Sequence, residues 1–272
     1  AASLPQSIPA AERAAIAAFY PARGHEPVWT DTSGLTGAGK ALVAELRKAD
    51  DWGLRAADFE VPQVAAQSTA GQLADADIKL MLAALKYARH ARGGRMDPAQ
   101  LSNAIDRKPP LVEPRRVLDG IATAAAPDAY LRGLHPQHPQ FERLRQKYVA
   151  MRSGALPVPA EVAAPVVDPP AKGKAKKQAQ QPAVSASSAR RVLYNMEQWR
   201  WMPESLGDTY VWVNIPEFTL RVVKGGKVVH AERVITGLVD KQTPIFSESM
   251  TTVVFHPFWG VPDSIKVKEL LP

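Results

Sequence analysis

A stretch of forty residues divides this 272-residue chain into two parts. Residues 152–191 contain seven basic and two acidic residues, six prolines, ten alanines and no aromatic residue. A segment of this composition buries too little apolar area to offset the entropy lost on ordering, so we predict a disordered, extended linker here. The linker carries +5 of the chain's net charge of +7, and it leaves candidate domains at residues 1–151 and 192–272.

Composition excludes several kinds of protein. The chain has no cysteine, which rules out a disulfide framework, a cysteine-ligated metal site and a thiol nucleophile within these residues. No apolar run approaches 18 residues, so we predict no membrane span. The basic run Lys172–Lys177 has no aromatic residues interleaved for base stacking. We therefore interpret it as a soluble spacer and predict no nucleic-acid partner.

The first part has the periodicity of a helical domain. Leu42 and Leu46 lie four residues apart, and Gly53 follows as a stop signal. Residues 72–92 place apolar side chains at helical spacing and end in cations, which complement the dipole of a helix C-terminus. We predict helices over Ala10–Tyr20, Ala38–Trp52, Gln72–Arg92, Glu113–Ala126 and Gln140–Met151.

The second part changes to a period of two. The sequence Lys224-Gly225-Gly226-Lys227 predicts a two-residue hairpin turn, because glycine accepts the positive φ of a primed turn. The predicted strands are Thr209–Ile215, Phe218–Val223, Lys227–Ile235 and Met250–His256, followed by a helical stretch over Ser264–Leu271. A sheet of four strands leaves unpaired edges, so we expect aggregation or loose folding of this half.

The usual signatures of catalysis are missing: there is no Walker loop, Gly-x-Gly-x-x-Gly, His-Glu-x-x-His or Gly-x-Ser-x-Gly. His135 and His138 lie close together, but their flanking prolines predict a loop or a helix start and no third ligand is evident. We therefore predict no metal site. The acidic residues of the second part show no pairing, and we interpret them as solvated: Glu197, Glu204, Glu217, Asp263 and Glu269.

The second part also contains four tryptophans, Trp199, Trp201, Trp212 and Trp259. Large aromatic rings more often fill a core than bind a ligand, so we predict core or inter-domain packing for most of them. The segment around His256 ends a predicted strand, where binding loops often lie. We select His256, Phe258 and Trp259 as candidate walls of a substrate groove.

Five segments of the second part occur in a specific order. They are Tyr194–Pro203, Val213–Phe218, Thr243–Ser247, Val254–Trp259 and Val261–Lys266. Together they resemble the opening of a YkuD-type catalytic domain, and more narrowly the YcbB-like L,D-transpeptidases of Gram-negative bacteria. The first part is similar to the scaffold domain of that family at Tyr20, Trp29, Gly53-Leu54, Gly94–Pro98 and the stretch from His135 to Tyr148.

The resemblance implies a periplasmic enzyme that remodels peptidoglycan without a cofactor. Its partners would be peptidoglycan stem peptides and, in some members, a lipoprotein acceptor. The family forms a thioester on the cysteine of a Ser/Thr-His-Gly-Cys motif, beside an earlier histidine. Each of the six histidines here is followed by Glu, Ala or Pro. We therefore assign no catalytic residue, and we expect a chain that stops before the nucleophile and is inactive alone.

The predicted fold class is α+β multidomain: an all-helical scaffold domain over 1–151, the linker over 152–191, and the incomplete start of a mostly-β YkuD-type domain over 192–272. The small peptidoglycan-binding domain that many relatives carry between the two is replaced here by the linker. The signal peptide is taken to have been removed before Ala1.

Two alternative functions remain open. The chain could be a catalytically dead envelope protein that binds peptidoglycan through its sheet and tryptophans. A weaker alternative is nucleic-acid binding through Lys172–Lys177, which would fall steeply with salt.

Overall fold

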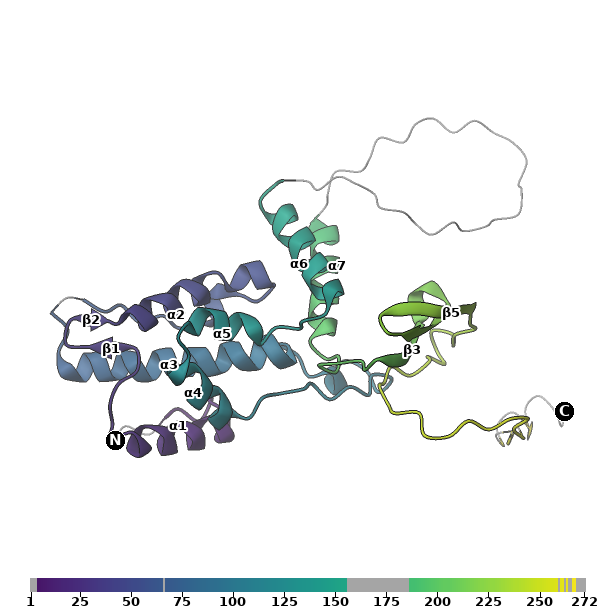
Figure 1. Cartoon of the computed structure of the whole chain (residues 1–272), viewed down its shortest axis with the longest axis horizontal. Coiled ribbons are helices and arrows are strands. Elements are labelled where there is room, and N and C mark those ends of the chain that lie inside the picture. The colour runs from purple at the N-terminus through teal and green to yellow at the C-terminus, as the bar shows by residue number, and fades with distance from the viewer. Residues whose placement is uncertain are drawn as a thin grey trace.

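The computed structural model describes residues 4–65, 67–155, 186–258, 260–261, 263 and 266–267. Figure 1 shows a helical bundle, a helical hairpin that projects from it, and a small antiparallel sheet on the far side of the hairpin. This arrangement confirms the predicted α+β class. Within the described residues, no helix is both long enough and apolar enough to cross a membrane.

The bundle is built around α3 (Ala70–Gly93), against which α2 (Gly37–Arg47) packs, while α1 (Ala10–Ala22) is joined to α3 by the Arg89–Glu12 ion pair. Thr69 and Gln72 form a capping box at the start of α3, which satisfies backbone amides that have no partner inside the helix. The predicted helix over Ala38–Trp52 is split. Its end is the 3₁₀ turn η1 (Ala49–Trp52), which Gly53 closes in the left-handed conformation.

Three further helices begin at prolines: α4 (Pro114–Thr123), α5 (Pro127–Gly133) and α6 (Pro139–Arg152). The prediction of one helix over Glu113–Ala126 was too long, and α5 was missed. Pro127 explains both errors, because the residue before a proline is disfavoured in the helical region and Ala126 adopts φ −134° and ψ 89°. The short segments are β1 (Thr30–Asp31), β2 (Gly34–Leu35), η2 (Ala56–Asp58) and η3 (Pro98–Gln100).

The bundle has one large hydrophobic core. Its fully buried side chains include Trp29, Leu42, Leu80, Tyr87 and Leu118. They come from the residue before β1 and from α2, α3 and α4, so burial of these apolar side chains holds the helices together.

Helix α7 (Ala186–Trp199) packs beside α6 to form the projecting hairpin. Residues 186–191 were predicted to be linker, and this was wrong. The helix is stabilised by tertiary contacts that composition does not reveal, because Val192 and Met196 are buried against Phe141 of α6. Of the rest of the predicted linker, Arg152 ends α6 and residues 156–185 lie outside the described residues, so the proposed domain limits stay predictions.

The sheet has the order β3 (Thr209–Asn214), β4 (Thr219–Lys224) and β5 (Lys227–Arg233), with η4 (Ile215–Glu217) between the first two strands. All pairs are antiparallel, and Lys224 faces Lys227 across the predicted hairpin turn. Gly225 and Gly226 have φ of 56° and 72°, as a primed turn requires. The hairpin prediction is therefore confirmed.

The fourth predicted strand was wrong. Residues 250–256 are all described, and they form no strand. The physical reason is the lack of a partner: every residue of β5 is exposed, and no other described strand pairs with that edge. The predicted helical stretch Ser264–Leu271 lies mostly outside the described residues.

Candidate functional site

The predicted groove residues lie on the segment that follows the sheet. His256 is exposed, with its backbone in the left-handed region at φ 49°, and Phe258 is fully exposed at 103%. Trp259 lies outside the described residues. The structure does not bring His256 and Phe258 against the three strands, so their place in a substrate groove stays a prediction.

A more completely formed site lies where α7 meets the bundle. The carboxylate of Glu197 accepts hydrogen bonds from the backbone amides of Arg95 and Met96, the latter at 3.2 Å. Glu197 is buried, so its interpretation as a solvated acid was wrong. An acid in this position provides an acceptor for two backbone amides just beyond the end of α3.

Arg200 lies three residues after Glu197 and is its ionic partner at 3.4 Å between Nη1 and Oε2. Its side chain is 0% exposed, and Nη2 donates to the backbone carbonyl of Trp52 at 2.6 Å. The guanidinium also lies over the ring of Phe141, 5.2 Å from the ring centre. Burial lowers the pKa of Arg200 from its ordinary value to about 10, partly opposed by the charge of Glu197. Arg200 is therefore still a cation at neutral pH.

Two glycines of the bundle make room for α7. A Cβ on Gly53 would lie 2.9 Å from Leu193 Cδ1, and a Cβ on Gly94 would lie 2.6 Å from Glu197 Oε1. Both glycines also have positive φ, of 73° and 83°. We name Gly53, Gly94, Glu197 and Arg200 the α7 junction. Its contacts hold the end of α7, from which the chain continues to β3, against the bundle.

A second contact joins the bundle to the segment after the sheet. Ile105 and Ile245 form an isolated parallel bridge, in which the Ile245 amide donates to the Ala104 carbonyl at 2.7 Å and the Asp106 amide to the Ile245 carbonyl at 2.8 Å. The guanidinium of Arg107 also donates to the Ser247 hydroxyl. The strands are thus held to the bundle both before β3 and after β5.

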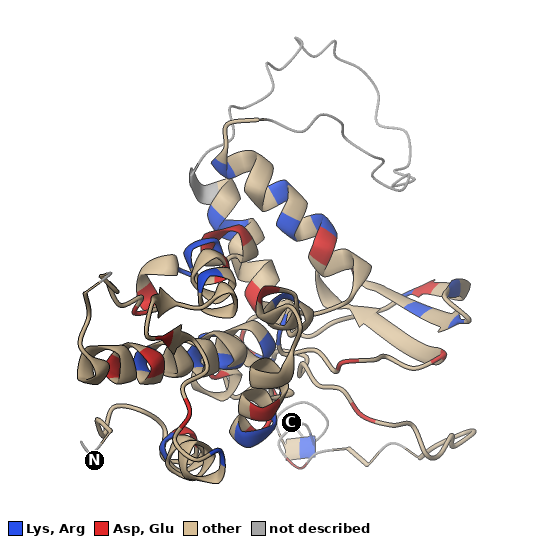
Figure 2. Ribbon diagram, turned by 60° about the vertical axis from the view of Figure 1, so that its left-hand side comes forward, with Lys and Arg blue, Asp and Glu red and all other residues tan. Residues whose placement is uncertain are grey.

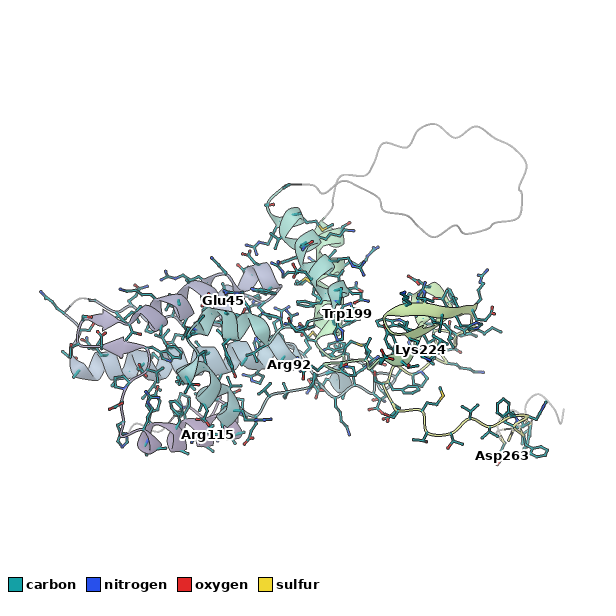
Figure 3. All side chains as sticks on the ribbon, in the orientation of Figure 1. Glu45, Arg92, Arg115, Trp199, Lys224 and Asp263 are labelled. Atoms are coloured by element: carbon teal, nitrogen blue, oxygen red, sulfur yellow. The ribbon has the colours of Figure 1, made fainter. Side chains whose placement is uncertain are left out.

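Outer contacts surround the junction, and Figure 3 labels Arg92 and Trp199 among them. Arg92 pairs with Glu204 at 2.6 Å, and His138 Nε2 lies 2.9 Å from the Pro203 carbonyl oxygen. A small pocket lies between these side chains. Glu204 was predicted to be solvated, and this is confirmed, because its side chain is 74% exposed in spite of this ion pair.

The tryptophans near the junction pack as predicted. Trp201 is buried, and the half-buried Trp199 lies 5.2 Å from the His138 ring and 5.5 Å from the Trp212 ring. Trp199 therefore links α6, α7 and β3. Core or inter-domain packing is confirmed for Trp199 and Trp201.

A buried polar network lies behind the junction. Glu45 accepts from the Trp52 indole at 3.0 Å, from the Tyr87 hydroxyl at 3.2 Å and from Arg132 at 2.7 Å. His135 Nε2 lies 2.9 Å from the Tyr87 hydroxyl, and its ring stacks on Trp52 at 4.3 Å. This network supports the part of η1 to which Arg200 binds.

The two histidines that are close in sequence have separate structural roles. Burial lowers the pKa of His135 well below 6.5, and the charges of Arg200 and Arg145 lower it further. His138 precedes α6 and contacts Pro203 and Trp199 instead. Among the residues that the structure describes, no group of three or more His, Asp or Glu side chains is placed to hold a metal ion.

Sequence reasoning missed the importance of Glu197 and Arg200. A usable signal was present, because a charged pair at i and i+3 lies within a stretch that contains Trp199 and Trp201. Charged residues among large apolar residues are often buried pairs, since an unpaired buried charge is costly.

Comparison with known proteins assigns both parts of the chain. Residues 14–147 match the scaffold domain family, and residues 208–272 match the L,D-transpeptidase catalytic domain family. A protein of Haemophilus influenzae, named as a proposed L,D-transpeptidase, is 28% identical over 83 residues. The match covers 30% of this chain and 17% of that relative's length. These likenesses agree with the resemblance in the sequence.

Proposed function

Because this chain belongs to the L,D-transpeptidases that carry a scaffold domain, we propose that it forms the scaffold and the first part of the catalytic domain of an enzyme that remodels peptidoglycan. The observation that carries the proposal is the order of the two matched families along one chain, joined by the buried α7 junction. The scaffold would hold the catalytic sheet in place.

The proposed chemistry is acyl transfer from a tetrapeptide stem. A cysteine thiolate attacks the diaminopimelate carbonyl, the bond to the terminal D-Ala breaks, and D-Ala leaves as a protonated amine. The amine of a second stem, or of a lipoprotein, then attacks the thioester, which forms the new amide and releases the thiol. Donors that stabilise the tetrahedral oxyanion lower the barrier of both steps.

This chain does not supply the nucleophile. It has no cysteine, and none of its histidines is followed by glycine. We therefore infer that the 272 residues alone do not transfer acyl groups, and that the thiol comes from residues outside them. The contribution of this part would be the sheet β3–β5 and, in the segment that follows it, a groove wall at His256, Phe258 and Trp259 for the stem peptide.

The proposed location is the periplasm, because peptidoglycan lies outside the cytoplasmic membrane. The proposed substrate, the peptidoglycan stem peptide, therefore supports a periplasmic location.

The test compares two proteins: this chain, and the product of the complete coding sequence of its gene. Each is incubated with tetrapeptide stems, and release of D-Ala is measured. We expect release only by a product that contains a Ser/Thr-His-Gly-Cys motif, and loss of release when that cysteine is changed to alanine. A coding sequence that ends without such a motif would contradict the enzyme assignment. Retention on sacculi without any release of D-Ala would favour the non-catalytic binding protein instead.

A further inference from the structure

The positive charge of this protein is concentrated in the α6–α7 hairpin and the chain between its helices. Residues 139–199 contain ten basic and four acidic residues, and so carry +6 of the net +7. The other 211 residues carry only +1. Net charge is a guide to where a protein attracts anions, so this segment is the first place to look for an anionic partner.

The acidic side chains of the two helices are already neutralised. Glu142 binds Arg145 through two hydrogen bonds of 2.7 Å, and Glu197 is buried in the α7 junction with Arg200. Figure 2 shows Lys and Arg along both helices of the hairpin at the top of the view. The exposed surface of the hairpin therefore has no described acid that is left to offset its cations.

Four exposed cations of the hairpin form no ion pair with any described residue: Arg143, Lys147, Arg190 and Arg191. We name these four the hairpin cations. Arg143 and Lys147 lie at i and i+4, so they share one side of α6. Arg190 and Arg191 belong to the first turns of α7, and α6 and α7 pack directly together.

We propose that the hairpin cations are a docking surface for the carboxylates of peptidoglycan, separate from the catalytic groove. The choice of this polymer rests on the proposed function. A carboxylate-bearing polymer suits cations spread over two packed helices because it presents anions repeatedly, and several weak contacts on one polymer add up to useful retention. Each contact is exposed and screened, with a Debye length of about 8 Å at physiological salt, so docking is reversible.

The structure favours peptidoglycan over a lipid surface. An interfacial helix needs a free apolar face to enter the headgroup region. The apolar residues Phe141, Val192 and Met196 of the hairpin are buried against one another, so they are not available to a bilayer. Duplex DNA is disfavoured because no described helix of the hairpin belongs to a recognised base-reading motif.

The test is co-sedimentation of the full 272-residue chain with purified sacculi over a range of salt concentrations. The hairpin variant carries Arg143→Gln, Lys147→Gln, Arg190→Gln and Arg191→Gln. The control variant removes four exposed cations elsewhere by Lys40→Gln, Arg47→Gln, Lys48→Gln and Lys108→Gln. The two variants have the same net charge, so a difference between them reports position and not total charge.

We expect the hairpin variant to bind sacculi at least tenfold more weakly than the control variant, and amidation of the sacculus carboxylates to abolish binding by the unchanged chain. Equal binding by the two variants overturns the proposal, and so does full binding to amidated sacculi. Tighter binding to anionic phospholipid vesicles or duplex DNA than to sacculi also overturns it. None of these measurements depends on acyl transfer. The docking proposal can therefore fail while the enzymatic proposal holds, and the enzymatic proposal can fail while the docking proposal holds.

Discussion

Arg200, the residue that follows α7, donates to the backbone carbonyl of Trp52 across 2.6 Å, and this bond joins the strand-bearing part of the chain to the scaffold. The same guanidinium neutralises the buried Glu197. Replacing Arg200 by methionine keeps much of the apolar volume but leaves the Glu197 carboxylate buried without its cation. Loss of one partner from a buried pair costs about 3–5 kcal/mol.

The Arg200→Met variant should therefore unfold at a clearly lower urea concentration than the unchanged chain. Arg191→Met is the matched control, because Arg191 is an exposed arginine of α7, and its loss should change stability by less than about 0.5 kcal/mol. Equal midpoints for the two variants would show that the junction does not stabilise the fold.

Gly94→Ala should loosen the α7 junction. A Cβ at this position would lie 2.6 Å from Glu197 Oε1 and 2.9 Å from Trp201 Nε1, and the backbone φ is +83°. We expect faster amide hydrogen exchange in residues 192–201 together with lower stability, because α7 must shift to relieve the contacts. Gly71→Ala in the first turn of α3 has open space around it and should leave stability equal or higher. Unchanged exchange in Gly94→Ala would argue against close packing here.

Asp77 should be the most sensitive acid of the scaffold. Its carboxylate accepts from the backbone amides of Val28, Trp29 and Thr30 and from the hydroxyl of Tyr20. Asp77→Asn turns one acceptor oxygen into a donor that faces other donors, so we expect a loss of about 3 kcal/mol or more in the free energy of unfolding. Chemical denaturation measures it.

The control for this carboxylate is Asp75→Asn. Asp75 is exposed and pairs only with Lys79, at 3.2 Å, among the described residues. Its loss should cost no more than about 0.5 kcal/mol. A small effect at both positions would mean that the hydrogen bonds of Asp77 contribute little.

Stability should fall in mildly acidic solution because two histidines are buried. Burial, aided by nearby cations, lowers the pKa of His90 to about 4 and that of His135 well below 6.5. The unfolded chain binds protons at these positions below about pH 6.5 while the folded chain does not. The free energy of unfolding therefore decreases as pH falls from 6.5 toward 4, by about 1.4 kcal/mol per pH unit for each histidine.

The measurement is urea unfolding of the unchanged chain and of His90→Gln at several pH values between 7 and 4.5. Other groups also titrate in this range, so the difference between the two slopes is the informative quantity. The free energy of unfolding of the variant should change less steeply with pH, by an amount that corresponds to about one bound proton. Identical slopes would contradict the burial of a neutral imidazole at this position.

Local sequence predicted much of the fold, and its errors have a common cause. The Gly225-Gly226 turn and the helical pattern of residues 72–92 depend on neighbouring residues only, and both predictions were confirmed. The start of α7 was missed because its stability comes from packing on Phe141, about 50 residues earlier in the chain. A strand over 250–256 was predicted from propensity, but a strand forms only with a partner.

The candidate site was also predicted only where local sequence was sufficient. The resemblance placed Tyr194–Pro203 among the important segments, but it did not reveal that Glu197 and Arg200 are buried against Arg95 and Trp52. Such contacts join residues more than 100 positions apart. No local pattern contains them.

The most direct test of the proposed acyl transfer is intact-mass spectrometry after incubation with tetrapeptide stems. The product of the complete coding sequence should gain the mass of one stem acyl group on a cysteine and release one equivalent of D-Ala. The 272-residue chain, which has no cysteine, should gain no mass. An acyl adduct on this cysteine-free chain, or no adduct on the complete product, would contradict the proposed role in L,D-transpeptidation.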